Sequence, residues 1–428
     1  MNFLAAFRRR RFLLLWTGQS ASHLGDHIYE IALAWWVLQK TGSAATMGAV
    51  LIAAFLPTII FVLIGGVLAD RLPRVWVMLV SDCARLVLML AMTAVAFSGR
   101  LPIGLVVALS ALIGLLGAFF QPAYNSIFPE LVPPDELTSA NSVTSFSVQF
   151  AHIVGPAVGA GLVAVGGIPF AFALNSFSYL LSALTLIEML RPPRKSVGGA
   201  EWTLAPASSA LAPADVTPAP SAGAWSGAGR FWRDLREGIA ATRELTWVWL
   251  TIALAGLANF ANEGAISVAL PYFIQHTLAA SPLLYGGLTA AAAVGGALGA
   301  WWLGSRGMRR RGLLIYGTFV VGMLATTVVG LAPWPAAMLA AMFVEGLCVT
   351  ALGLAWATAL QQYIPLEKLG RVSSLDQLGS YVMIPLSYGL AGLLVDHYGA
   401  RPVLIWAGLI AAAVVSLGFL SRSVRALD

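Results

Sequence analysis

The sequence predicts an all-α membrane protein with twelve transmembrane helices arranged as two pseudo-symmetric six-helix bundles. Of its 428 residues, 59% are hydrophobic and only 10% are charged, whereas soluble domains contain about 25% charged residues. Because about 20 apolar residues cross the hydrocarbon core of a bilayer, the hydropathy divides the chain into twelve membrane-spanning segments. The predicted segments are 12–38, 46–69, 75–97, 102–128, 138–164, 168–190, 246–274, 282–304, 312–331, 336–362, 372–395 and 401–421.

A polar stretch in the middle of the chain separates the two predicted bundles, which occupy residues 1–190 and 246–428. Within residues 191–245, the part rich in Ala, Pro, Ser and Gly is expected to be a flexible cytoplasmic linker. The part from Phe231 to Ile239 is expected to form an amphipathic helix on the membrane surface. The two halves repeat weakly, since Trp35–Thr41 resembles Pro271–Thr277. Repeated halves with a site between them are typical of secondary transporters.

The basic residues predict the orientation of the chain in the membrane. Nearly all of the 25 Lys and Arg residues fall on one side of the predicted segments, whereas Lys40, Arg100 and Arg401 fall on the other and Arg85 lies within a segment. Cytoplasmic loops of membrane proteins are enriched in Lys and Arg. We therefore expect a multi-pass protein of the bacterial cytoplasmic (inner) membrane with both termini in the cytoplasm. The net charge of +6 reflects this topology, so a nucleic-acid partner is not expected.

Four ionisable residues lie on one face of the first predicted helix. His23, Asp26, His27 and Glu30 have the spacing i, i+3, i+4 and i+7, which places them along one helical stripe. Ionisable groups at membrane depth are costly when they face lipid, so they face a bundle interior or a wet cavity. We expect the stripe to bind protons or substrate. The alternative, that these groups are buried helix–helix contacts, stays open, especially for the two histidines.

The second half carries a related set of polar residues. The weak repeat aligns the stripe with Asn259, Asn262 and Glu263, and Glu345 lies in the tenth segment. We expect the acidic residues of both halves to line one central, water-accessible chamber. A carboxyl group in apolar surroundings favours its neutral form, so it can release a proton when a cation arrives. For Glu345, structural hydrogen bonding remains the alternative.

The connection between the second and third segments contains a recognisable motif. Its residues Gly66, Asp70, Arg71 and Arg74 resemble the signature Gly-x-x-x-Asp-Arg-x-Gly-Arg-Arg/Lys of the major facilitator superfamily, from which Pro73 and Val75 depart. The resemblance implies the major facilitator fold and a cytoplasmic gate at this loop. Asp376, near the inner end of the eleventh segment, is expected to join the gate. The corresponding loop of the second half, residues 304–312, has Met308 in place of the acid.

Further motifs in the first half strengthen this resemblance. Gly155, Pro156 and Gly159 are similar to the Gly-Pro-x-x-Gly element of drug/proton antiporters, in which small residues permit close helix approach and proline permits bending. The stretches Leu24–Asp26, Ser81–Arg85 and Phe119–Pro122 resemble the macrolide-efflux and enterobactin-exporter branch. The fourth segment lacks the arginine that many drug antiporters carry there. Asp82 and Arg85 are expected to form a local pair near the inner end of the third segment, with Arg85 peripheral.

The predicted function is secondary active transport, with proton-coupled export of lipophilic small molecules as in antibiotic or multidrug efflux. The export direction and the substrate class follow from the resemblance alone. An exporter of a siderophore, lipid or other metabolite is the nearest alternative. Remote alternatives are a polytopic membrane enzyme that uses Asp26, His23 and His27 as acid/base groups, and a sensor or scaffold.

The sequence also indicates which partners to expect. It contains no P-loop, no His-Glu-x-x-His and no Cys-x-x-Cys, so we expect no enzymatic activity, cofactor or metal site. The expected partners are a small-molecule substrate, protons and the lipid bilayer, and we expect the protein to act as a monomer.

Overall fold

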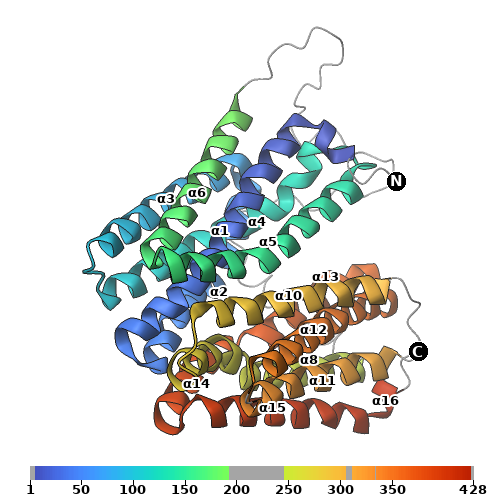
Figure 1. Ribbon diagram of the computed structural model, residues 1–428. Coiled ribbons are helices and arrows are strands. Elements are labelled where there is room, and N and C mark those ends of the chain that lie inside the picture. Colours follow the sequence, from blue (N-terminus) through green and yellow to red (C-terminus); the bar gives the residue numbers. More distant parts are fainter. Residues whose placement is uncertain (1–4, 192–244, 305–310, 333, 426–428) are drawn as a thin grey trace.

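The computed structural model describes residues 5–191, 245–304, 311–332 and 334–425, and every regular element within these ranges is helical. The helices before the predicted linker (the first set) and those after it (the second set) form two groups, which Figure 1 shows in blue to green and in yellow to red. The first set consists of a short 3-10 helix (Ala5–Arg8), α1 (Arg10–Thr41), α2 (Ala44–Arg71), α3 (Arg74–Phe97), α4 (Ile103–Leu131), α5 (Leu137–Val165) and α6 (Ile168–Leu190).

The second set contains six spans, two of which are irregular. Its elements are α8 (Thr246–Gly264), a π-helical segment (Ala265–Ala269), α9 (Leu270–Tyr272), a second π-helical segment (Phe273–Thr277), α10 (Pro282–Gly304), α11 (Arg311–Leu331), α12 (Pro335–Tyr363), α13 (Leu366–Tyr381), α14 (Ile384–Tyr398), α15 (Ala400–Ser416), a 3-10 helix (Leu417–Leu420) and α16 (Arg422–Arg425).

Eleven helices among the described residues are long and apolar enough to cross a membrane. The remaining long helix is α1, which has 32 residues but carries the polar stripe and basic residues at both ends, which lower its hydropathy. Together with α1, these helices account for the twelve predicted spans. The all-α membrane fold is therefore confirmed.

Local sequence explains where several helices begin and end. Gly42 follows α1 in the left-handed conformation (φ 62°), which costs glycine little. Ser43 then caps α2 by accepting a hydrogen bond from the backbone N–H of Thr46. The eleventh predicted span, expected as one segment, is divided into α13 and α14 at Val382 and Met383. Pro385 accounts for this break, because it lacks an N–H group and sits in the first turn of α14.

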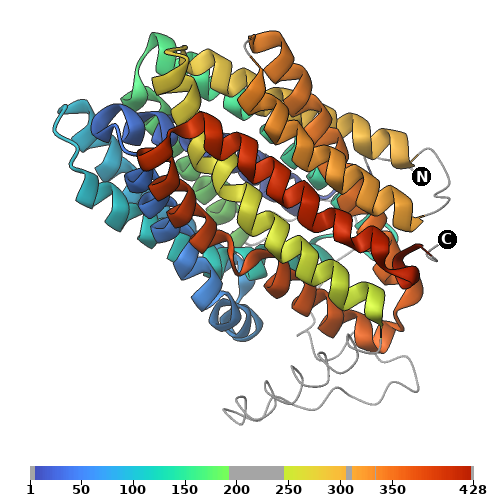
Figure 2. The same cartoon turned by 90° about the horizontal axis from the view of Figure 1, so that it is seen from below.

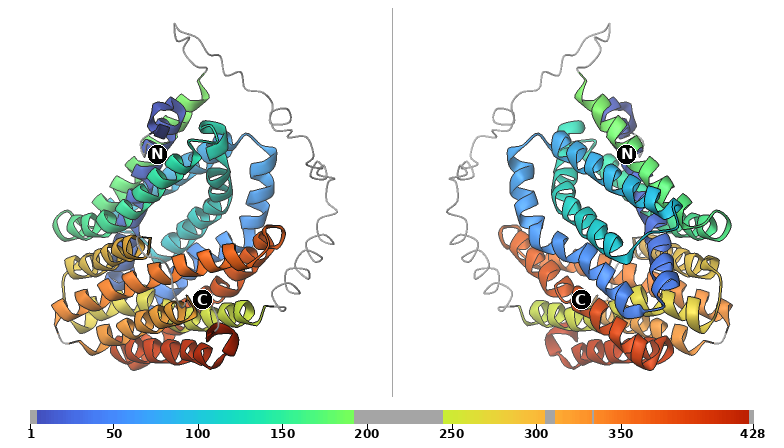
Figure 3. Two further views of the ribbon diagram at one scale, coloured as in Figure 1. Left: turned by 90° about the vertical axis from the view of Figure 1, so that its right-hand side faces the viewer. Right: turned by 90° about the vertical axis from the view of Figure 1, so that its left-hand side faces the viewer.

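The two sets meet mainly along two helix pairs, α2 with α14 and α5 with α10. A Cβ atom at Gly48 would lie 2.4 Å from the carbonyl oxygen of Tyr388, and one at Gly286 would lie 2.5 Å from that of Pro156. The α2–α14 contact lies near the start of α2, whereas the α5–α10 contact runs from the start of α10 toward its middle, where the side chain of Gln149 donates to the carbonyl of Ala293 (2.8 Å). Figures 1 and 3 show the 3-10 helix Ala5–Arg8 and α16 at the opposite end of the bundle. The sets therefore join at the end remote from these elements (the far end), and Figure 2 shows α15 and α8 side by side across the second set.

Some expectations fall outside the described residues. They concern the linker, including the amphipathic helix at 231–239, and the loop around Met308.

Candidate functional site

The polar stripe of α1 faces α6 and α5 within the first set. The carboxyl group of Asp26 accepts a hydrogen bond of 2.6 Å from the hydroxyl of Tyr179 on α6. Gly25, next to it, lies against Ser178, where an added Cβ would be 2.2 Å from the hydroxyl oxygen. Helices α1 and α6 are therefore in close contact at the position of Asp26. This contact places the acid beside a phenol group.

A buried polar network continues behind Asp26. Gln19 donates to the hydroxyl of Ser182 (2.8 Å), which donates to Asp82 (2.6 Å). Asp82 is fully buried and pairs with Arg85 at 3.6 Å. The guanidinium of Arg85 also lies within electrostatic range of Asp26. Arg85 therefore pairs with the buried Asp82 and also acts electrostatically on the half-buried Asp26.

The expectation that Arg85 is peripheral is wrong. Arg85 lies midway along α3, is only 8% exposed, and sits over the rings of Phe120 at 4.8 Å and Tyr179 at 5.8 Å. Gly117 on α4 leaves room for it, because a Cβ there would lie 3.3 Å from a guanidinium nitrogen. The expected pairing with Asp82 is present, but the pair belongs to the centre of the first set.

The two histidines of the stripe have different surroundings. His27 bonds through Nδ1 to the carboxyl of Glu30 (2.8 Å), and its ring lies 4.0 Å from the ring of His152 on α5. The ring of His23 packs edge-on against Tyr124, and its Nε2 has no hydrogen-bond partner among the described residues. His152 was not among the residues predicted for the site. Its position one helical turn before Gly155 could have indicated it, since that turn faces α1.

Glu30 is the exposed residue of the stripe. Its side chain is 64% exposed, and it lies within electrostatic range of Asp26 on its own helix. It also lies within electrostatic range of the phenol groups of Tyr285 on α10 and Tyr388 on α14. Glu30 is therefore the acid of the first set that faces the second set.

The acids of the second set form a separate group. Glu263 accepts a hydrogen bond from Ser267 (3.0 Å) and interacts electrostatically with Glu345 on α12 and with Tyr388. Asn262 is buried, and its side-chain oxygen has no hydrogen-bond partner among the described residues. The four acids thus lie in two groups, Asp26 with Glu30 and Glu263 with Glu345. Tyr388 lies within electrostatic range of both.

Irregular backbone surrounds the second group. A π-helical segment begins directly after Gly264, and such segments are frequent at functional sites. Asn259 donates to the backbone carbonyl of Ser380 at 3.0 Å, near the break between α13 and α14. At membrane depth, backbone polar groups beside a helix break lack their usual helical partners. The side chain of Asn259 supplies a donor to one of these groups, the carbonyl of Ser380.

The residues of the predicted cytoplasmic gate lie at the end of α2 and the start of α3. Arg74 forms an ion pair with Glu130 of α4, and Arg71 is exposed. Gly66 has open space around it, and the side chain of Asp70 lies outside the described residues. Asp376, the further predicted gate residue, accepts hydrogen bonds within the second set, from Trp356 (2.9 Å) and Ser380 (3.3 Å).

The predicted helix-bending element lies against α1. A Cβ at Gly155 would approach the His27 side chain to 2.6 Å, and one at Gly159 would approach the backbone of Ile28 to 3.0 Å. Pro156, between them, lies within α5 and its carbonyl oxygen faces α10. The element thus sits where α5 contacts both α1 and the second set.

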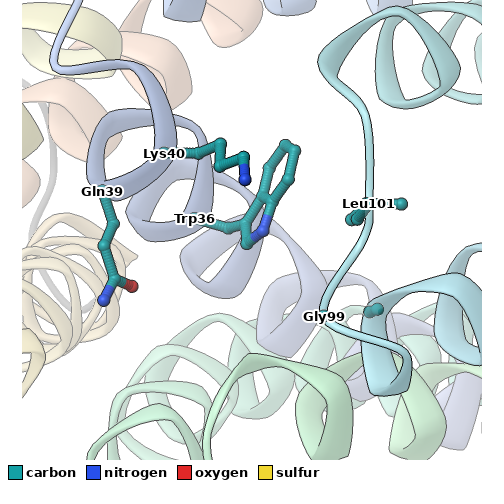
Figure 4. Close-up of a pocket in the computed structure, with 6 residues that line it drawn as sticks. Trp36, Gln39, Lys40, Gly99 and Leu101 are labelled. Atoms are coloured by element: carbon teal, nitrogen blue, oxygen red, sulfur yellow. The ribbon is translucent and has the colours of Figure 1, made fainter.

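A separate depression opens at the far end of α1. It has a volume of about 280 Å³, and Figure 4 shows Trp36 and Lys40 on one wall and Gly99 and Leu101 on the other. It lies beyond the polar stripe in sequence and in space. It contains none of the predicted site residues.

Comparisons with known proteins agree with this architecture. Residues 15–388 match the family described as Major Facilitator Superfamily. The chain is 25% identical to macrolide efflux protein A of Streptococcus pyogenes over 98% of this chain and 97% of that protein. It is 28% identical to the multidrug efflux pump Tap of Mycolicibacterium fortuitum over 92% of this chain and 91% of that protein.

A solved structure shows the same fold at low identity. The bacterial homologue of the iron transporter ferroportin, in an inward-facing state, superposes with a TM-score of 0.68 at 16% identity, covering 96% of this chain and 98% of that one. The family match spans most of the chain and agrees with the helical architecture. The chain therefore belongs to the major facilitator superfamily and is a multi-pass membrane transporter rather than an enzyme.

Proposed function

We propose that this protein exports lipophilic, cationic small molecules from a bacterial cell in exchange for protons. Two relatives that align over nearly the whole chain are named as macrolide and multidrug efflux proteins, which supports drug efflux. The observation that carries the cation preference is the exposed carboxyl of Glu30, which bonds to His27 and lies within electrostatic range of Tyr285 and Tyr388 of the second set. An acid and aromatic rings together favour a cation.

The charge of Arg85 bears on the alternative of an anionic cargo such as a siderophore. An anion would need a free cation at its binding site, but Arg85 is buried and engaged with Asp82. The geometry therefore favours cations over anions. Asp26, Glu30, Glu263 and Glu345 are the proposed proton or substrate sites, with His23, His27, Asn259 and Asn262 beside them.

The two helix sets are the proposed moving bodies. With both termini in the cytoplasm, the far end is the outer side of the cytoplasmic membrane, so the contacts of α2 with α14 and of α5 with α10 close that side. Transport then requires these contacts to separate while the gate around Gly66, Asp70, Arg71, Arg74 and Asp376 closes the inner side, with Gly155, Pro156 and Gly159 allowing α5 to bend. One chain supplies both bodies, so the proposed unit is the monomer.

Proteoliposomes with an acidic lumen provide the test. Proton efflux should drive uptake of tetraphenylphosphonium, a lipophilic cation, and should drive little uptake of a catecholate anion. Asp26→Asn should abolish this gradient-driven uptake, because the amide cannot release a proton, while binding of the cation in detergent persists. Glu188→Gln, which removes an acid from an exposed ion pair near the ends of α1 and α6, is the matched control and should transport normally. Unchanged uptake by Asp26→Asn would remove Asp26 from the mechanism.

A further inference from the structure

Asp396, at the end of α14, reaches across to the first turn of α2. Its carboxyl oxygens accept hydrogen bonds from the hydroxyl of Ser43 (2.7 Å), the backbone N–H of Ala44 (2.7 Å) and the backbone N–H of Ala45 (3.1 Å). The acid belongs to the second set and its three donors belong to the first. This contact is therefore a polar connection between the two sets at the far end.

The start of a helix is well suited to hold a carboxylate. The first N–H groups of a helix have no partners within it, and the helix dipole adds partial positive charge there. Ser43 accepts from Thr46 and donates to Asp396, so the serine and the acid cap α2 together. Hydrogen bonds to an ionised acceptor are about twice as strong as neutral ones.

The backbones of α2 and α14 approach each other closely around Asp396. A Cβ at Gly392, one turn before the acid, would lie 2.7 Å from the carbonyl oxygen of Ala44 and from the Cα of Ala45. Gly48, one turn into α2, is equally close to the backbone of α14. Such close approach lets the carboxylate reach the N–H groups directly, so separating the helices would break all three bonds together.

The sequence around Asp396 repeats the spacing of the gate motif. Gly392 precedes Asp396 by four residues, as Gly66 precedes Asp70, and Gly399 follows at the position where Pro73 stands in the first loop. Gly399 has a φ of 82°, a conformation that favours glycine. The same glycine–acid spacing thus occurs at both ends of α2. At the end of α2 the acid is its own residue Asp70, and at its start the acid is Asp396 of the neighbouring helix α14.

We infer that Asp396 is a latch that holds the far end closed and must release α2 before that end can open. The inference rests on the alternating-access part of the proposed function. It does not depend on which substrate or ion is transported.

The test measures the distance between the sets at the far end in the full chain. Spin labels at Arg100→Cys and Trp334→Cys, both at exposed positions in the connections after α3 and α11, report this distance in lipid nanodiscs, with Cys83 and Cys348 replaced by serine. Asp396→Ala removes all three bonds and should raise the ratio of far-end-open to far-end-closed molecules well over tenfold, because losing one charge-assisted hydrogen bond corresponds to about a factor of ten. Ser43→Ala removes one of the three bonds and should raise the ratio about tenfold, because the two backbone bonds remain.

The residue that follows Asp396 in the sequence provides a control. His397→Gln alters the adjacent residue, whose ring packs on Tyr398, and should leave the distances unchanged. If Asp396→Ala does not fold, Ser43→Ala decides the question. Distances in Asp396→Ala and Ser43→Ala that match the unsubstituted protein would overturn the latch. Because no substrate or proton gradient enters this readout, a failure of proton-coupled export would be seen separately in the proteoliposome assay.

Discussion

Removing one member of the buried pair Asp82–Arg85 should destabilise the protein far more than removing both. Asp82 is fully buried, with Arg85 at 3.6 Å and a hydrogen bond from Ser182. Asp82→Ala leaves the guanidinium without this partner in a low-dielectric interior. Arg85→Met leaves the carboxylate without its cation, held by Ser182, with a side chain of similar length in place of the arginine.

The expected magnitudes follow from the geometry of the pair. Breaking a buried ion pair costs about 3–5 kcal/mol, because it leaves an uncompensated charge. Arg85 keeps electrostatic contact with Asp26 and rests on the ring of Phe120, so Asp82→Ala should fall near the low end, about 3 kcal/mol. The double substitution removes both charges and should cost about 1–2 kcal/mol, far less than the sum.

Reversible unfolding in mixed micelles, followed by tryptophan fluorescence, gives the four free energies of the cycle. A coupling energy of a few kcal/mol is expected, since residues in contact are not additive. Additive effects, or a cost below about 1 kcal/mol for Asp82→Ala, would refute the pairing.

Two further predictions concern surface and backbone contacts. The hydrogen bond and charge of Arg9 hold the pKa of Glu136 below its usual range. The ion pair therefore stabilises the folded protein at pH values above the pKa that Glu136 has in the unfolded chain, and this stabilisation is lost as the pH falls through the lower pKa of the folded state. The difference in melting temperature between the unsubstituted protein and Glu136→Gln should accordingly disappear below about pH 4. Asn259→Ala should cost about 1–2 kcal/mol of unfolding free energy, because the carbonyl of Ser380 then lacks its donor, and an unchanged melting curve would contradict this role.

The fold could be predicted from the sequence because its signals are local. Hydropathy marks each span, and the spacing of Asp26, His27 and Glu30 fixes their shared face without knowledge of any other helix. The break at Val382 also had a local signal in Pro385. The sequence does not show which helix packs against each face, so it could not show that Asp26 is held by Tyr179 while the side chain of Glu30 is exposed.

The place of Arg85 shows why other parts of the site escaped prediction. Its central position depends on the packing of α3 against α4, where Gly117 leaves space, and on the rings that α4 and α6 bring to it. Asp396 escaped for a similar reason, since its donors on α2 precede it by about 350 residues. Contacts between distant segments are set by packing, which no local pattern encodes.

The distribution of polar bonds supports the proposal that the two sets move as bodies. The network from Gln19 through Asp82 to Arg85 joins α1, α3 and α6 within the first set. Bonds of this kind resist separation, because an unpaired buried polar group is costly. By contrast, the helices that cross between the sets approach through glycines, at Gly48 and Gly286. The polar bonds that cross between the sets include those of Asp396 with the start of α2 and of Gln149 with the carbonyl of Ala293, so rocking should break these bonds and leave the internal networks intact.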